Sequence, residues 1–245
     1  MPAHWNTEDL LSRLRSRPEA LEPGLRFLEQ PLILGPDLQV ELCGEDLLGR
    51  PVLVLPVTDQ ADRVCDRLLS LVAGLRGQRD RFSARFAQAG SPRALLIGEH
   101  YRSGLLDRLA LLRAAIPVRS FLVEAGGTAE APEPVFRLQS EGPAQSCAGL
   151  TGQLGPLERR LLERLLLAAR SIQPPVVVLG DSWPLLFSGR HGCFAALHSD
   201  QGRLLLAWLG GPRERELLEL LDDAAMDLAI DVLLRQQSDP ITVRN

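Results

Sequence analysis

Lysine is absent from this sequence of 245 residues, since all 27 basic residues are arginine. The guanidinium group stays protonated, so no side-chain amine is available for a Schiff base or for proton transfer beside a scissile phosphate. Aromatic residues make up only 4% of the chain, and the formal net charge is −4. The composition therefore excludes lysine-dependent catalysis and provides no overall positive field that would attract nucleic acid.

Long apolar runs are also missing, and none reaches the roughly 18 residues that a membrane-spanning helix requires. The first residues show no cationic segment followed by an apolar one, so we expect a cytoplasmic protein without membrane contact. The four cysteines are widely spaced and form no Cys-x-x-Cys motif, which favours free thiols in a reducing compartment. They are Cys43, Cys65, Cys147 and Cys193.

The first 140 residues alternate between helical and strand-like patterns. Apolar residues recur at helical or two-residue spacing, and Gly or Pro separates the runs. The expected helices cover 7–16, 60–87 (with a break or a second helix at Gly77) and 103–115. The expected strands cover 25–29, 38–43, 51–57, 94–97, 118–123 and 135–139.

The later part of the chain predicts a second, smaller α/β domain. A helix is expected over 157–171, strands near 175–179, 193–198 and 203–208, and a long amphipathic helix over 212–236 that includes Glu214 to Arg235. Residues 125–156 are rich in Gly, Pro, Ala and Ser outside the last strand, which is typical of a loop or linker. We therefore expect a domain at 1–140, a linker at 141–156 and a small α/β domain at 157–245.

The segment from Arg17 to Val57 carries a succession of short motifs, RPEALEPGLRFLEQPLILGPDLQVELCGEDLLGRPVLVLPV. It begins with Pro-x-x-Leu-Glu-x-Gly-Leu, continues through the strand VELCG and the turn from Asp46 to Arg50, and ends in the strand VLVLPV. This succession resembles the catalytic domain of NucS-type endonucleases, and residues 93–124 resemble the elements that follow in that family. The resemblance covers about residues 10–140. It implies a restriction-endonuclease-like αβββαβ core, which is a mixed sheet flanked by helices.

The resemblance also implies where a cutting centre would lie. In the family, an Asp on one strand and a Glu on the next hold a divalent cation, and a Lys two positions later shares their face. In this sequence Glu41 stands in place of the Asp, Leu55 in place of the Glu and Val57 in place of the Lys. Aliphatic side chains offer a cation no ligand. We therefore expect a degenerate site with a packed apolar patch, no metal, no cofactor and no cutting activity.

Migration of the metal ligands is the alternative, because Glu41, Glu45, Asp46 and Asp59 lie close together in the sequence. The favoured interpretation places Glu45 and Asp46 on an exposed turn and Asp59 at the beginning of a helix, as its cap.

An arginine-rich region follows, and its arginines are candidates for contact with nucleic-acid phosphates. The candidates are Arg63, Arg67, Arg76 and Arg79, with Arg81 and Arg85 beyond them. Acidic residues lie among them, so a solvated face with local ion pairs is the favoured interpretation.

Three further patterns carry weaker signals. Val176 to Ser182 is similar to the nucleophile block of GDS-type serine esterases, but no Asp-x-x-His segment follows it. Cys193 and His198, preceded by His191, fit no strong zinc spacing. His100 and Tyr101 lie at a strand-to-helix turn, a common place for functional groups.

These observations lead us to expect a non-catalytic nuclease-fold protein that acts as a binding or scaffold module, through a protein partner or self-association. Docking of the C-terminal helix on a second subunit is one form that this could take. The alternative is a DNA-binding accessory protein, or a weak metal-dependent nuclease that uses Glu41 and neighbouring carboxylates. A hydrolase centred on Ser182 is the third hypothesis.

Overall fold

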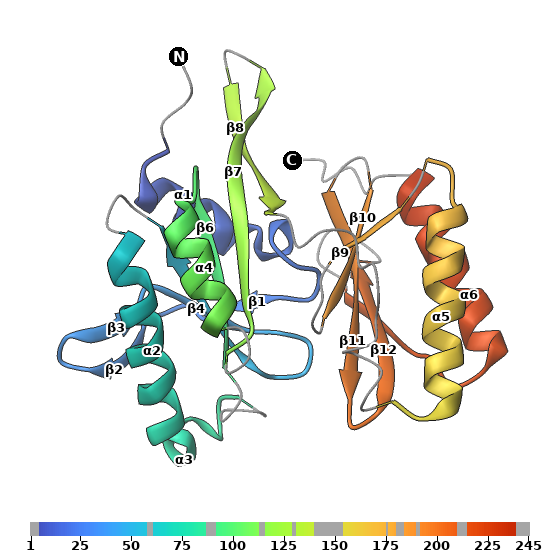
Figure 1. Cartoon of the computed structure of the whole chain (residues 1–245), viewed down its shortest axis with the longest axis horizontal. Helices are drawn as coiled ribbons and strands as arrows, with labels where there is room; N and C mark the ends of the chain where they lie inside the picture. The colour runs from blue at the N-terminus through green and yellow to red at the C-terminus, as the bar shows by residue number, and fades with distance from the viewer. Residues whose placement is uncertain are drawn as a thin grey trace. The chain divides into compact units, whose positions relative to one another are not determined.

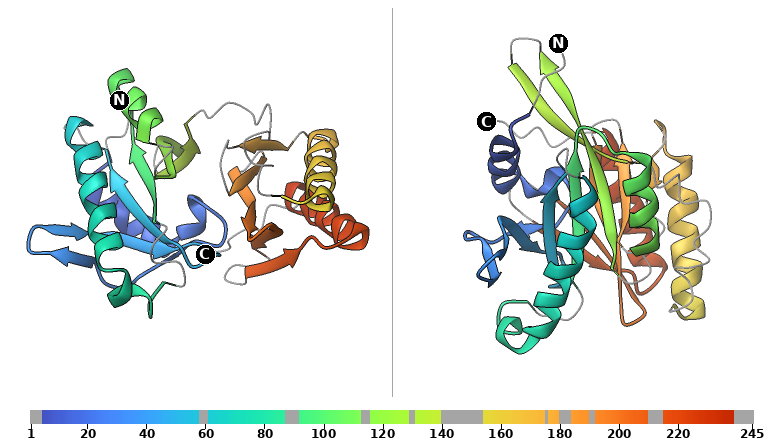
Figure 2. Two further views of the ribbon diagram at one scale, coloured as in Figure 1. Left: turned by 60° about the horizontal axis from the view of Figure 1, so that its bottom comes forward. Right: turned by 60° about the vertical axis from the view of Figure 1, so that its left-hand side comes forward.

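A computed structural model describes ten stretches of the chain. They are residues 5–57, 61–86, 92–112, 116–128, 131–139, 154–174, 176–179, 184–189, 192–209 and 215–238. The chain divides into an N-terminal unit, Met1–Leu21 with Leu25–Gln139, and a C-terminal unit, Glu22–Gly24 with Ser140–Asn245. Each unit contains its own sheet (Figures 1 and 2). Within the described residues, no helix has both the length and the hydropathy needed to cross a lipid bilayer.

The N-terminal unit is built on a mixed six-stranded sheet with the order β1-β4-β5-β6-β7-β8. Strands β5, β6 and β7 are parallel, and the remaining pairs are antiparallel. Parallel neighbours need crossover connections, and here α2 (Ala61–Gly77) and α4 (Ser103–Leu112) lie between them in the chain. The strands are β1 (Arg26–Phe27), β4 (Leu42–Glu45), β5 (Pro51–Pro56), β6 (Arg93–Gly98), β7 (Val118–Thr128) and β8 (Ala131–Leu138).

Helices cover both faces of this sheet, because the strand residues are apolar on both sides. On one face, Leu53, Leu55 and Leu96 pack with residues of α2 and α4. On the other, Val54 and Leu95 pack with leucines of α1 (Thr7–Ser16). The α/β class with a mixed sheet flanked by helices, expected from the sequence, is confirmed. The smaller elements are η1 (Pro18–Ala20), the hairpin of β2 (Leu32–Gly35) and β3 (Leu38–Val40), and α3 (Arg79–Phe82).

The C-terminal unit is an antiparallel meander with two helices on one face. Its sheet has the order β13-β12-β11-β10-β9, and both α5 (Pro156–Ser171) and α6 (Asp223–Ser238) contribute to one apolar cluster with it. Figure 1 shows the two helices side by side, and Arg164 of α5 pairs with Asp223 and Asp227 of α6 at 2.7 and 2.6 Å. The strands are β9 (Val177–Leu179), β10 (Leu185–Gly189), β11 (Gly192–Asp200), β12 (Arg203–Leu209) and β13 (Arg215–Glu219).

The prediction of one long helix over 212–236 is wrong. The described part of this segment forms strand β13 and then α6, which begins at Asp223. The Asp222 carboxylate, just before the helix, accepts a hydrogen bond from the Ala225 backbone N–H at 2.8 Å. Short leucine-rich runs fit both helix and strand, and pairing with β12 decides between them.

Smaller differences also concern strands. The expected strand at 38–43 is interrupted at Glu41 and gives β3 and β4, while β2 and β10 were not predicted. The alternative of a second helix after Gly77 is confirmed, since α2 ends at Gly77 and α3 follows it.

Candidate functional site

The hairpin of β4 and β5 brings Glu41, Leu55 and Val57, the three positions that the resemblance singles out, to one end of the sheet. Leu42 lies opposite Val54, so the same register carried one step further places Glu41 opposite Leu55. Beyond the end of β5, the Val57 N–H donates to the Ile97 carbonyl at 2.7 Å and thereby extends the pairing with β6. The fold therefore assembles the place at which the resemblance would put a metal centre.

The side chains at this place do not fit a divalent cation. Leu55 is 2% exposed within the cluster formed with α2 and α4, and Val57 packs against the same cluster. Glu41 is exposed, and its backbone carbonyl accepts a hydrogen bond from Arg15 Nη2 at 3.0 Å. A divalent cation needs several hard oxygen ligands, and two of these three positions are aliphatic.

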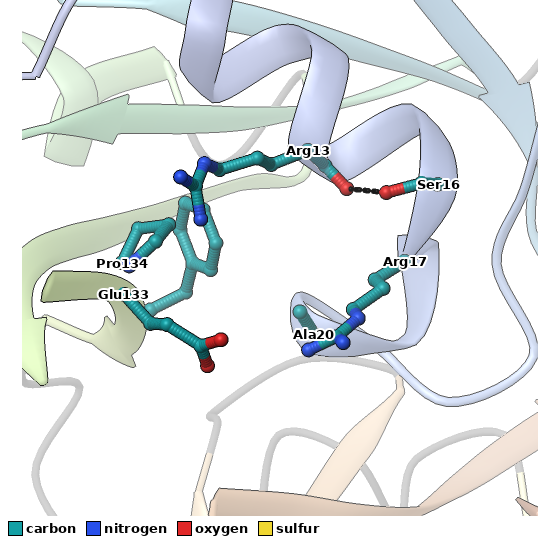
Figure 3. Close-up of a pocket in the computed structure, with 7 residues that line it drawn as sticks. Arg13, Ser16, Arg17, Ala20, Glu133 and Pro134 are labelled. Carbon is teal, nitrogen blue, oxygen red and sulfur yellow. Dashed lines mark hydrogen bonds between the residues drawn. The ribbon is translucent and has the colours of Figure 1, made fainter. Parts of the chain in front are cut away.

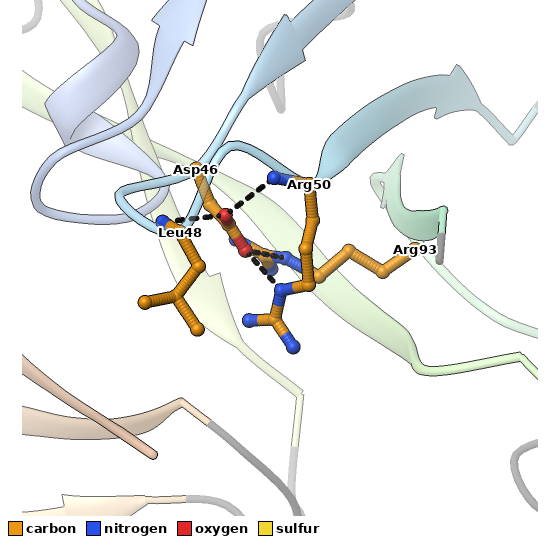
Figure 4. Close-up of polar contacts among 4 residues, drawn as sticks. All are labelled: Asp46, Leu48, Arg50 and Arg93. Atoms are coloured by element: carbon orange, nitrogen blue, oxygen red, sulfur yellow. Dashed lines mark hydrogen bonds and ion pairs between the residues drawn. The ribbon is translucent and has the colours of Figure 1, made fainter. Parts of the chain in front are cut away.

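Among the described residues, Asp46 is the buried carboxylate nearest in sequence to these positions (Figure 4). Its Oδ1 accepts hydrogen bonds from the backbone N–H groups of Leu48 and Arg50 at 2.9 and 3.0 Å. Its Oδ2 accepts from Arg50 Nε at 2.7 Å and from Arg93 Nε at 2.9 Å. The expectation of an exposed turn is wrong for this residue, which is only 3% exposed.

These four hydrogen bonds define the role of Asp46. An ionised carboxylate has about four acceptor positions, and the donors that bond to it here include two backbone amides and two guanidinium groups. Gly49 closes the turn with a φ of 71°, in the left-handed region that favours glycine. The carboxylate thus fixes the β4–β5 turn and neutralises Arg93, which is itself 2% exposed.

The other carboxylates considered as ligands of a rearranged metal site do not form one in the described residues. Glu45 is half-buried at the end of β4, opposite Pro51, and Asp59 lies outside the described residues. In the described stretches, no three side chains of His, Cys, Asp or Glu gather in a way that could hold a metal ion.

The arginine candidates are all exposed, but they do not form a single strip. At 100° per residue, Arg67 and Arg76 lie on opposite flanks of the solvent-facing side of α2. Arg67 Nη2 donates to the Gln39 carbonyl at 3.3 Å, and Arg79 belongs to the separate short helix α3. Arg63 lies one turn before Arg67, so only these two share a side of α2.

The remaining sequence candidates are dispersed. Tyr101 donates from its hydroxyl to the Phe121 carbonyl at 3.0 Å, and burial raises the pKa of this hydroxyl, while His100 is exposed. Cys193 is half-buried and His198 is fully buried on β11. Ser182 and His191 lie outside the described residues.

A cleft that the sequence did not predict lies between α1 and β8 (Figure 3). It has a volume of about 220 Å³, and its lining includes two guanidinium groups, a carboxylate and two apolar rings. Figure 3 shows the guanidinium of Arg13 beside Pro134, with Arg17 across from them. The guanidinium carbon of Arg13, Cζ, lies 5.6 Å from the centre of the Trp5 ring. The cleft is lined by Arg13, Ser16, Arg17, Ala20, Glu133, Pro134 and Phe136. No sequence pattern connects residues 13–20 with 133–136, because only the folded sheet brings them together.

Comparison with protein-family models, with curated proteins and with solved structures found no match for this chain.

Proposed function

We propose that this chain is a non-catalytic binding protein whose N-terminal unit retains a restriction-endonuclease-like frame. The succession of α1, the β4–β5 hairpin, α2 and β6 supports the frame. One observation carries the loss of catalysis: Leu55 and Val57 occupy the ligand and lysine positions as part of the apolar core, while Glu41 is exposed. Burying an aliphatic side chain contributes about 1.5–3 kcal/mol to stability, so the replaced site now serves folding.

The binding role that we propose uses the cleft between α1 and β8. Arg13 and Arg17 provide two positive charges against the single negative charge of Glu133, and Phe136 and Pro134 provide apolar surface. Guanidinium groups donate two parallel hydrogen bonds to a carboxylate, and an aromatic wall accommodates an apolar side chain. This combination favours a peptide segment of a partner protein that carries a carboxylate next to an apolar residue.

Loss of catalysis is tested with purified protein, single-stranded, branched and mismatched DNA, and Mn²⁺ or Mg²⁺. We expect no cleavage by the wild-type chain beyond the level seen with Glu41→Ala. Cleavage that requires Glu41 would overturn the proposal and support a weak nuclease instead.

The cleft is tested by capture of partners from a native lysate with tagged wild-type chain and three charge-reversed variants. We expect a partner that is retained by wild type, lost with Arg13→Glu and Arg17→Glu, and kept with Arg15→Glu. Arg15 is the matched control, since it is an exposed arginine of the same helix that does not line the cleft. Equal capture by all four proteins would contradict the assignment of the cleft.

A further inference from the structure

Strand β13 ends the five-stranded sheet of the C-terminal unit, so one side of its backbone has no neighbouring strand in the described structure. The Leu220 N–H donates to the Leu204 carbonyl of β12 at 2.9 Å. In an antiparallel ladder, alternate residues direct their N–H and C=O groups to the same neighbour. The backbone N–H and C=O groups of residues 216 and 218 therefore point toward β12. Those of residues 215, 217 and 219 point toward the open side.

The side chain at the middle of this edge is apolar and accessible. Leu217 lies opposite Ala207 and is 53% exposed, whereas its neighbour Leu218 packs against the cluster beneath the helices. Because side chains alternate with a period of two, Glu219 shares the face of Leu217, which points away from the helices, and position 215 has the same register in the strand. β13 contains no proline, which is a common means of blocking an open edge.

The sequence of β13, Arg-Glu-Leu-Leu-Glu, is complementary to itself in one antiparallel register. If two copies pair about a twofold axis at Leu217, position 215 of each copy lies opposite position 219 of the other. An arginine then faces a glutamate on both sides of a central leucine pair. The backbone N–H and C=O groups of residues 215, 217 and 219 all point outward. Each of these residues therefore forms a backbone hydrogen-bonded pair with the residue opposite it in the second copy.

We propose that β13 is a homodimerisation edge, at which two chains pair antiparallel about Leu217 and join their five-stranded sheets. A twofold interface uses the same patch on both subunits, and this strand meets that requirement in backbone orientation, side-chain face and charge. The proposed partner is a second copy of this chain. The inference is independent of the cleft in the N-terminal unit and of the lost metal centre.

Sedimentation equilibrium over a range of concentrations tests this interface. We expect the wild type to approach twice the 26.9 kDa of one chain. Glu219→Arg and Arg215→Glu each place like charges opposite each other at both pairs, and each should weaken dimerisation by about tenfold or more. The double variant restores opposite charges and should dimerise as the wild type does.

Two further variants separate pairing from folding. Glu216→Arg makes the same charge change at a neighbouring position that points toward β12, and we expect it to leave the dimer intact. Leu217→Pro removes an outward N–H without removing a donor to β12, so the protein should keep its circular dichroism spectrum and become monomeric. A monomeric wild type, or a double variant that stays as weak as either single variant, would overturn the proposal.

Discussion

Asp46 joins a turn to a strand that begins 47 residues later, through its pairing with Arg93. Both side chains are about 2% exposed, so the charges are removed from water, and the partners that compensate them include each other, Arg50 and the turn amides. A buried ion pair adds little when compared with a well-packed apolar pair, but the removal of one partner leaves the other charge poorly compensated.

Asp46→Ala should therefore lower the free energy of unfolding by about 3–5 kcal/mol. Chemical denaturation followed by circular dichroism measures the change. Asp37, on the exposed turn between β2 and β3, provides the control, and Asp37→Ala should change stability by less than about 0.5 kcal/mol. Equal effects of the two substitutions would contradict the role assigned to Asp46.

Burial raises the pKa of the Cys43 thiol to about 12. The thiol is neutral in the folded protein up to that pH, whereas in the unfolded chain it ionises near its ordinary pKa of about 8.5. The raised folded pKa therefore contributes stability that is complete below about pH 8.5 and is lost as the pH rises toward 12. Tyr101, whose pKa is also raised by burial, changes stability in the same direction.

Urea denaturation at a series of alkaline pH values should thus show falling stability, with a shallower fall for Cys43→Ala than for the wild type. The comparison uses the slopes with pH, because the substitution itself alters packing. Cys65→Ala, at another buried thiol, controls for the loss of a sulfur atom. A slope that Cys43→Ala leaves unchanged would refute the assignment.

At the scale of elements, Gly44 permits the pairing of β1 with β4. A Cβ at this position would collide with the Arg26 carbonyl oxygen and would lie 2.8 Å from Phe27 Cδ1. The close approach of the two backbones is what allows the short β1 to pair at the edge of the sheet.

Gly44→Ala should displace β1 and cost about 1–3 kcal/mol of unfolding free energy. Gly77→Ala is the control, since a Cβ there meets nothing within 4 Å. Alanine also has a higher helix propensity than glycine, so this substitution at the end of α2 should not destabilise the helix. Thermal unfolding of both variants measures the difference. A Gly44→Ala protein as stable as Gly77→Ala would show that β1 adjusts without cost.

The contact between α5 and α6 combines apolar packing with the ion pairs of Arg164. These pairs are exposed to water, where an ion pair contributes about 0–1 kcal/mol. Arg164→Ala should therefore destabilise the protein by less than about 1 kcal/mol, and the difference from wild type should shrink at high salt. A larger loss that does not depend on salt would show that the arginine stem contributes mainly through packing.

Taken as a whole, the N-terminal unit buries Leu55 and packs Val57 against the same apolar cluster, at positions where the resemblance would require cation ligands. A ligand that binds only the folded state raises the melting temperature, so cation binding is visible without any activity measurement. We expect millimolar Mn²⁺ to leave the melting temperature of the wild type unchanged relative to Glu41→Ala. A rise seen in the wild type alone would locate a cation at Glu41.

Features that depend on residue identity and on the local spacing of apolar residues could be predicted from the sequence. The absence of lysine excludes lysine chemistry, and the aliphatic side chains at 55 and 57 offer a cation no ligand wherever the chain places them. The periodicity of apolar residues also predicted most helices and the parallel strands, because a buried sheet face requires that pattern.

Features that depend on partners distant in the sequence became visible only in the folded chain. The tertiary structure buried Asp46 by supplying Arg93 from β6, and it made residues 215–219 a strand by supplying β12. It also formed the cleft from two segments more than a hundred residues apart. The physical reason is the same in each case: a carboxylate, a short leucine run or an exposed arginine is compatible with several environments, and contacts remote in sequence select one of them.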